Sequence, residues 1–121
     1  MQEFGVDAAL TGPHAIVTVR GELDAHTAPE LRSKLLELVE AGADRFVVDL
    51  RGVTFVESVG LGVLVAARKR LRQHDRSLCL VLTKQQSVVR RTFEITGLTK
   101  VFPIHETVEE AEEDCLKEPA A

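Results

Sequence analysis

The chain has 121 residues, 45% of them hydrophobic and 28% charged, proportions that fit one globular domain able to close a core without disulfides or metal. Its net charge of -4 excludes a general attraction to nucleic acid or to an anionic membrane, and two cysteines are too few for a secreted disulfide scaffold. The first residues lack the features of a signal peptide, and the longest apolar run, residues 59–67, is too short to span a membrane. We therefore expect a cytoplasmic protein with one domain over residues 1–121, frayed from about residue 116.

The N-terminal residues predict an antiparallel β-hairpin. Apolar side chains alternate with other residues over residues 4–10, and residues 15–20 form a second run typical of a strand. Turn chemistry at Gly12 and Pro13 separates the two runs by few enough residues for a direct hairpin connection.

An amphipathic helix is predicted after the hairpin. Thr27 stands three residues before Glu30, which is the spacing of a capping box, and Pro29 is tolerated in the first turn because its missing N–H needs no helical partner. Gly42 is expected to end the helix. The inner face is marked by leucines that recur at helical spacing: Leu31, Leu35 and Leu38.

The middle of the chain predicts a buried strand and a second helix. Residues 46–50 are a short apolar run of the kind found in parallel strands, and residues 51–57 are expected to form a loop. The helix is expected over residues 58–73, because apolar residues recur there at helical spacing. Its inner side is expected to carry Leu61, Leu64, Val65 and Leu71.

The C-terminal half repeats this alternation of strands and helices. Residues 78–82 predict a buried strand, residues 85–96 a third helix and residues 101–102 a short strand. Thr107 and Glu110 have capping-box spacing at the start of a last helix. Its inner stripe is expected to contain Val108, Ala111 and Cys115. The order β-β-α-β-α-β-α-β-α predicts an α/β domain with about four helices and a mixed, mostly parallel sheet that begins with the antiparallel hairpin.

Two segments are expected to meet at the carboxyl ends of the parallel strands, residues 21–27 and residues 53–62. Ser58 lies where a loop is expected to become a helix, so a phosphate on its hydroxyl would meet unpaired helix N–H groups and the positive end of the helix dipole. A helix-capping role alone would also explain this serine. Gly60 and Gly62 either let a partner approach closely or allow tight packing of the helix on the sheet.

No residue pattern predicts a catalytic or metal site. The histidines show no ligand spacing and are expected on the surface or in loops: His14, His26, His74 and His105. A group of carboxylates near the strand ends is the candidate for cation binding or for acid–base chemistry: Glu22, Asp24, Asp49 and Glu57. The basic stretch at residues 68–76 lacks the interleaved aromatic residues that stack nucleic-acid bases, so we interpret it as a solvated helix face.

The two cysteines are both predicted to be buried. Cys79 lies in a predicted strand and Cys115 on the inner stripe of the last helix, and two small buried residues are the default interpretation. If the last helix lies over the strand that holds Cys79, the two sulfur atoms could approach each other and form a redox-sensitive bond.

Three segments, in order and at their expected spacing, carry a family resemblance. Residues 21–32 (GELDAHTAPELR) look like a first signature, residues 48–64 (VDLRGVTFVESVGLGVL) like a second that contains a regulated serine, and residues 96–104 (TGLTKVFPI) like a closing segment. The chain thus resembles the STAS-domain anti-sigma factor antagonists of bacteria, especially the actinobacterial members. The resemblance covers nearly the whole chain and implies a single STAS domain.

The resemblance implies a switch protein and not an enzyme. The unphosphorylated form binds an anti-sigma factor that is also a GHKL-type serine kinase, and a sigma factor is set free. Phosphorylation of the serine, here Ser58, ends the complex, and a PP2C-type phosphatase restores the binding form. ATP and magnesium belong to the kinase, so the chain is expected to need no cofactor or metal, to contact neither nucleic acid nor membrane, and to be a monomer when free. The expected partner-binding residues are Glu22, Asp24, His26, Thr27, Glu57, Ser58, Val59, Gly60, Leu61 and Gly62.

The serine motif of this chain departs from the usual Asp-Ser-Ser/Thr-Gly of the family. Val59 removes the second hydroxyl, which leaves Ser58 as the only phosphorylatable residue of the motif, and Glu57 keeps the negative charge with one more methylene. These departures keep open a STAS scaffold, or a module for a small ligand or lipid, that is never phosphorylated. A small enzyme using the strand-end carboxylates is a third alternative.

Overall fold

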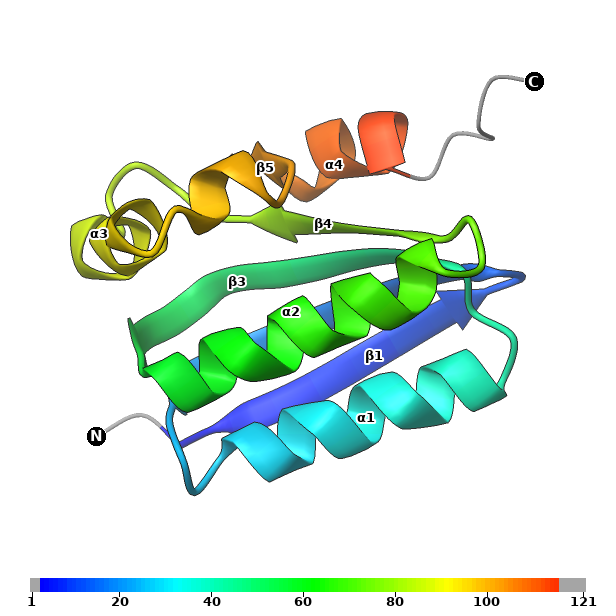
Figure 1. Ribbon diagram of the computed structural model, residues 1–121, viewed down its shortest axis with the longest axis horizontal. Helices are drawn as coiled ribbons and strands as arrows, with labels where there is room; N and C mark the ends of the chain where they lie inside the picture. The colour runs from blue at the N-terminus through cyan, green and yellow to red at the C-terminus, as the bar shows by residue number, and fades with distance from the viewer. Residues whose placement is uncertain (1–2, 116–121) are drawn as a thin grey trace.

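A five-stranded mixed sheet forms the centre of the fold in the computed structural model, which describes residues 3–115 (Figure 1). The strands lie in the order β1-β2-β3-β4-β5; β1 and β2 are antiparallel, and every other neighbouring pair is parallel. The strands are β1 (Gly5–Thr11), β2 (His14–Leu23), β3 (Arg45–Val56), β4 (Ser77–Val81) and β5 (Ile104–His105). The predicted mostly parallel sheet with an N-terminal hairpin is confirmed. The fraying expected from residue 116 lies outside the described residues.

Helices cover both faces of the sheet. Within residues 3–115 they are α1 (Ala28–Glu40), α2 (Ser58–Arg72), α3 (Ser87–Ile95) and α4 (Val108–Cys115), with a short 3-10 turn at Leu98–Lys100. Helices α1 and α2 lie side by side across one face (Figure 1), and α4 packs against β3 and β4 from the other. The prediction of about four helices is confirmed for this part of the chain.

The core is divided between these two faces because successive side chains of a strand point in opposite directions. Phe46 and Val48 of β3 belong to the larger core cluster under α1 and α2, whereas Val47 belongs to a smaller cluster under α4. The rest of the smaller cluster consists of Cys79, Val81, Ala111 and Cys115. A site built on α2 and a site built on α4 therefore lie on opposite faces of the sheet.

The predicted helix over residues 28–40 has the expected inner face and the expected end. Its three predicted inner leucines are buried, and Gly42 follows the last turn with φ of 98°, a left-handed conformation that side chains disfavour. Of the two hydrogen bonds of the capping box predicted at Thr107 and Glu110, one is confirmed: the N–H of Glu110 donates to Oγ1 of Thr107 at 3.1 Å.

Strand β3 is longer than its apolar run, and the prediction of a loop over residues 51–57 was wrong. The backbone stays extended as far as Val56 and pairs with the end of β2, through contacts such as Gly21 with Val53 and Leu23 with Val56. The register shifts twice along this pair, so buried residues do not alternate regularly in β3. Because the pattern of alternation is broken there, the sequence alone did not indicate a strand.

Two further predictions were wrong. Val65 was expected on the inner side of α2 but is 38% exposed, because it lies about 100° around the helix from the buried Leu64. The strand expected at residues 101–102 lies instead at β5, after Pro103, while Phe102 is buried in the larger core cluster. A large aromatic side chain gains more by filling the core than by pairing as an edge strand.

The side chain of Gln86 joins the start of α3 to β3. Its Nε2 donates to the carbonyl oxygens of Leu50 at 2.8 Å and Val53 at 2.9 Å, and its Oε1 accepts from the N–H of Thr83 at 2.9 Å. Since Leu50 and Val53 are buried, their carbonyl groups have little access to water as a substitute partner.

Gln86→Ala is therefore expected to lower the free energy of unfolding by about 1–3 kcal/mol, the usual cost of leaving buried polar groups unsatisfied. Urea denaturation of the two proteins measures this difference. Gln85→Ala, at the exposed neighbouring residue, is the control and should have a small effect. Equal effects of the two substitutions would show that the amide of Gln86 contributes nothing specific.

Candidate functional site

The two segments predicted to converge do so at the carboxyl ends of β2 and β3. The strands are parallel neighbours here, and the N–H of Glu57 donates to the carbonyl oxygen of Leu23 at 2.9 Å. Each strand then leads to the N-terminus of a helix, α1 after β2 and α2 after β3. The edge of the sheet thus presents two helix starts close to one another.

Ser58 is the first residue of α2, and its side chain is exposed. The N-cap residue is Glu57, and no hydrogen bond of the Ser58 hydroxyl to any of residues 3–115 is seen, so a capping role does not account for this serine. The carbonyl oxygen of Glu57 accepts from the N–H groups of Gly60 at 3.0 Å and Leu61 at 3.2 Å. Within the described chain, the N–H groups of Ser58 and Val59 remain without an acceptor, as the first turn of a helix requires.

Two exposed apolar residues lie within three positions of the serine in the sequence. Phe55 at the end of β3 is 40% exposed, and Val59 beside Ser58 is 48% exposed. Phe55 was not among the residues expected to contact a partner, because the segment that holds it was interpreted as a loop. An aromatic residue directly before Val56, the buried last residue of the strand, is the signal in the sequence that could have indicated it. The site therefore combines a hydroxyl, free N–H groups and apolar surface.

The two glycines of α2 have different roles. A Cβ on Gly60 would lie 2.5 Å from Cγ of Leu23, a fully buried side chain, so Gly60 allows the helix to pack tightly against the end of β2. A Cβ on Gly62 would meet nothing within 4 Å, and Gly62 is exposed. Leu61 was expected to contact a partner, but it is only 4% exposed. We therefore assign Gly60 and Leu61 to the core and keep Gly62 on the candidate surface.

Asp24 organises the turn that leads into α1. Its Oδ1 accepts from the N–H groups of His26 at 2.9 Å and Thr27 at 3.1 Å. Partial burial opposes ionisation, but these hydrogen bonds outweigh it and hold the pKa of the Asp24 carboxyl below its ordinary value. Thr27 does not form the predicted capping box with Glu30: its Oγ1 donates to the carbonyl oxygen of Glu22 at 2.8 Å and accepts from the N–H of Asp24 at 2.9 Å. The hydroxyl is thus used to close this turn.

The strand-end carboxylates do not all gather as one group. Glu22, Asp24 and Glu57 are at the edge with Ser58, and the side chains of Glu22 and Glu57 are exposed. Asp49 is buried within β3 and forms a bidentate ion pair with Arg51, whose Nε and Nη2 donate at 3.0 and 2.9 Å. The hydrogen bonds that Arg51 donates to Asp49 raise the pKa of Arg51, and the charge of this carboxylate is already paired. The suggested four-carboxylate cation site is therefore not formed.

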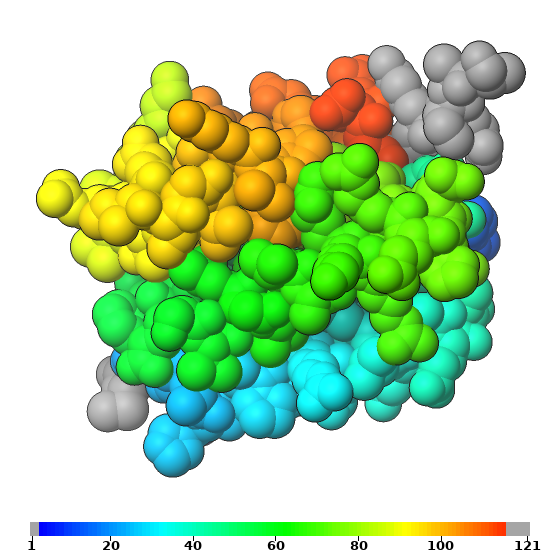
Figure 2. All heavy atoms as spheres, viewed as in Figure 1, coloured from blue at the N-terminus to red at the C-terminus, as the bar shows by residue number. Residues whose placement is uncertain are grey.

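An apolar groove of about 460 Å³ runs between α1 and α2. Figure 2 views the molecule from this side, with α2 in green between α1 and the C-terminal elements. Val59 and Gly62 form part of the wall contributed by α2, so the groove is continuous with the surface around Ser58. Arg32 of α1 and Arg70 of α2 are the charged residues of its lining.

Cys79 and Cys115 are buried neighbours, as expected if α4 lies over β4. Both are free thiols; Sγ of Cys115 donates to the carbonyl oxygen of Phe46 at 3.3 Å. Contact with Cys115, together with burial, raises the pKa of the Cys79 thiol above its ordinary value, which keeps it protonated at neutral pH. The redox-sensitive bond itself stays a prediction.

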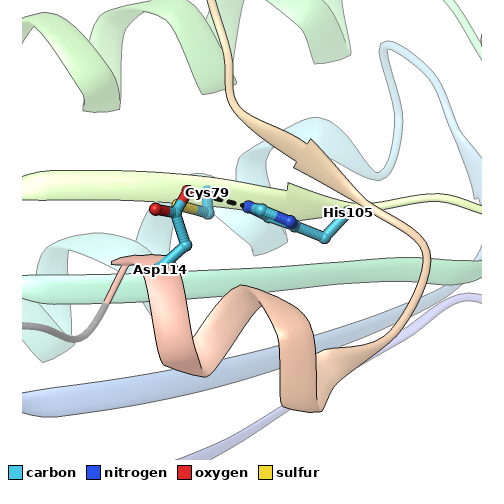
Figure 3. A group of neighbouring side chains, drawn as sticks. All are labelled: Cys79, His105 and Asp114. Atoms are coloured by element: carbon cyan, nitrogen blue, oxygen red, sulfur yellow. Dashed lines mark hydrogen bonds and ion pairs between the residues drawn. The ribbon is translucent and has the colours of Figure 1, made fainter.

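His105 departs from the expectation that every histidine lies on the surface or in a loop, since it is half-buried in a strand. His105 lies on β5, its Nε2 is 3.1 Å from Oδ2 of Asp114, and Cys79 lies beside it (Figure 3). Among the described residues, this is the group in which three ligand-type side chains come together. The sequence did not indicate it because the three residues belong to three separate elements.

Fold and site together define a small α/β domain in which an exposed serine begins a helix at the edge of the sheet. The chain belongs to the STAS domain family, which it matches over residues 6–111. It is 37% identical over 93 residues to an anti-sigma-B factor antagonist of Staphylococcus aureus, a match that covers 77% of this chain and 84% of that protein. A protein of the same name from Staphylococcus epidermidis is 36% identical over 93 residues, which again cover 77% of this chain and 84% of that protein.

Solved structures agree with this family. An anti-sigma factor antagonist from Mycobacterium paratuberculosis superposes with a TM-score of 0.85 at 29% identity, covering 95% of this chain and 96% of that one. The antagonist SpoIIAA in its unphosphorylated form gives a TM-score of 0.75 at 21% identity over 92% and 94% of the two chains, a likeness of fold. The resemblance to anti-sigma factor antagonists stated from the sequence is confirmed, and the structural neighbours include an actinobacterial member.

None of the helices within residues 3–115 combines the length and the apolar character needed to cross a lipid bilayer.

Proposed function

We propose that the chain is an anti-anti-sigma factor: its unphosphorylated form binds an anti-sigma factor and frees a sigma factor, and phosphorylation of Ser58 ends the binding. The names of the staphylococcal and mycobacterial relatives support the first half of this proposal. Those relatives are regulators, and the chain likewise acts as a regulator and not as an enzyme. The observation that carries the second half is the exposed, unbonded hydroxyl of Ser58 on the first turn of α2.

The position of Ser58 suits a charge-based switch. A phosphate adds roughly 1.5 to 2 negative charges at pH 7, and the free N–H groups and the dipole at the start of α2 favour negative charge there. The modified helix therefore stays folded. The effect falls on the surface around Ser58, where the exposed apolar side chain of Val59 would lose water when a partner docks. A phosphate in such a desolvated interface is costly unless cations of the partner match it.

The proposed partners follow the same chemistry. An anti-sigma factor that is a GHKL-type serine kinase would bring its own ATP and magnesium, so the chain would need no cofactor for this cycle. A PP2C-type phosphatase would reverse the modification. Asp24 supports docking by holding the neighbouring turn, while Glu22, His26 and Glu57 place polar groups around the serine.

The experiment is affinity capture of tagged wild-type and Ser58→Ala protein from the native cell, with mass spectrometry of the bound proteins and of the peptide that contains Ser58. A GHKL-type kinase captured by Ser58→Ala, together with phosphate on Ser58 in the wild type, is the expected result. The captured kinase with ATP and magnesium should then modify the wild type but not Ser58→Ala. Ser87→Ala is the matched control, because Ser87 is also an exposed first residue of a helix. Absence of the kinase and of phosphate under both growth and stress would contradict the proposal.

The groove between α1 and α2 favours a second candidate function, binding of a small amphiphile. Its lining is largely apolar, while Arg32 and Arg70 offer positive charge to an acidic head group. Binding of a fluorescent fatty acid that is lost in Arg70→Gln and unchanged in Ser58→Ala would support this function. A partner affinity that does not respond to Ser58 at all would favour it over the phosphorylation switch.

A further inference from the structure

Three unlike side chains come together on the face of the sheet opposite to α1 and α2. The Cys79 sulfur, a ring nitrogen of His105 and a carboxylate oxygen of Asp114 all lie within 4.8 Å of one another (Figure 3). We propose that these residues form a binding site for a divalent metal ion of the zinc class. The proposal is independent of the function proposed for the Ser58 surface.

The strand register explains why the three side chains meet. Cys79 and Val81 are two residues apart on β4, so they point to the same face of the sheet. His105 of β5 pairs with Val81, and this places its ring on that face as well. Helix α4 packs over β3 and β4 there and contributes Asp114 from its last turn. Each of three elements therefore supplies one donor atom.

The donor set selects the class of metal. A thiolate, an imidazole and a carboxylate are all ligands of Zn²⁺, with bonds of about 2.0–2.3 Å that set the ligand atoms of a tetrahedral site about 3–4 Å apart. Nε2 of His105 and Oδ2 of Asp114 are already 3.1 Å apart, and the Asp114 side chain is 62% exposed, so it can adjust. Magnesium and calcium require oxygen ligands, which a site with a thiol does not provide.

Three protein ligands leave the fourth position of a tetrahedral ion open to water. On binding, the Cys79 thiol would release its proton to solvent and the sulfur would donate an electron pair to the ion. The contact between Nε2 of His105 and Oδ2 of Asp114 would be replaced by two bonds to the metal, and any proton on Nε2 would also pass to solvent. Cys115 is not a member of this group of three, although it contacts Cys79: its sulfur donates to the Phe46 carbonyl and lies 3.5 Å from the Ser77 hydroxyl. The bound ion would tie α4 to β4 and β5 without touching the Ser58 surface.

The test is titration of the reduced full chain with Co²⁺, and with Zn²⁺ in competition with a coloured chelator. We expect one ion per chain, a thiolate-to-cobalt charge-transfer band and the visible bands of tetrahedral Co²⁺. His105→Ala and Asp114→Asn are expected to weaken binding by about a hundredfold or more, since even residues that only support ligands cost about 10–100-fold. Cys79→Ser should remove the charge-transfer band. Zn²⁺ should raise the melting temperature of the wild type and not that of Asp114→Asn.

Matched variants separate this site from general attraction to an acidic helix. Glu113→Gln removes a neighbouring exposed carboxylate, and Cys115→Ser removes the other thiol and any disulfide; both should keep the cobalt spectrum and the affinity. The proposal is overturned if the wild type shows no thiolate-to-cobalt band, or if Glu113→Gln loses as much affinity as Asp114→Asn. Because Asp114 is exposed, Asp114→Asn should fold like the wild type, which circular dichroism verifies.

Discussion

Ser58→Glu is expected to weaken binding to the anti-sigma factor by about a hundredfold or more, equivalent to about 3 kcal/mol. The carboxylate would introduce a charge beside Val59, which offers exposed apolar surface to a partner. It would not unfold the domain, since negative charge on the first turn of a helix is favourable by about 0.3–1 kcal/mol. Isothermal titration calorimetry with the purified partner measures the loss of affinity.

Two controls show whether charge is the cause. Ser58→Gln has nearly the same size as Ser58→Glu without the charge, and Ser58→Ala removes the hydroxyl; both should bind far more tightly than Ser58→Glu. Chemical denaturation should show that none of the three substitutions destabilises the chain by more than about 0.5 kcal/mol, as is usual for exposed residues. Equal affinities of the Glu and Gln variants for the anti-sigma factor would contradict a switch that acts through charge.

Gly60→Ala is expected to lower the free energy of unfolding by about 1–3 kcal/mol, the range for overpacking a filled core. The added methyl group would lie 2.5 Å from Cγ and 2.8 Å from Cδ2 of Leu23, which is fully buried at the end of β2. Either Leu23 leaves its place or α2 moves away from the sheet. Both responses would also displace Ser58, because it starts the same helical turn. Urea denaturation measures the loss of stability.

Gly62→Ala provides the matched control on the same helix. A methyl group there meets nothing within 4 Å, so the substitution should stabilise the chain by about 0.5–1 kcal/mol through the higher helix propensity of alanine. Opposite signs for the two substitutions would confirm that only Gly60 is required for packing. If both variants gained stability equally, the contact between Gly60 and Leu23 would be shown to relax at no cost.

Local patterns predicted the elements whose structure depends on nearby residues. The leucines of α1, the stop at Gly42 and the turn at Gly12 and Pro13 were each predicted correctly, because helix periodicity and positive φ are properties of short segments. Thr107 was likewise predicted as the cap of α4. Thr27 was assigned the wrong hydrogen bonds, because its hydroxyl closes a turn with Glu22 instead. Spacing indicates which atoms can meet, and the path of the backbone decides which do.

The sequence by itself determined the family, the order of the strands and helices, the mixed sheet and the place of Ser58 at the start of a helix. Tertiary structure decided the features that depend on partners far along the chain. The extension of β3 to Val56 requires the end of β2 beside it. The different roles of Gly60 and Gly62 follow from whether Leu23 lies beneath them. The meeting of Cys79, His105 and Asp114 depends on strand register and on the docking of α4, and neither leaves a pattern that one segment of sequence can show.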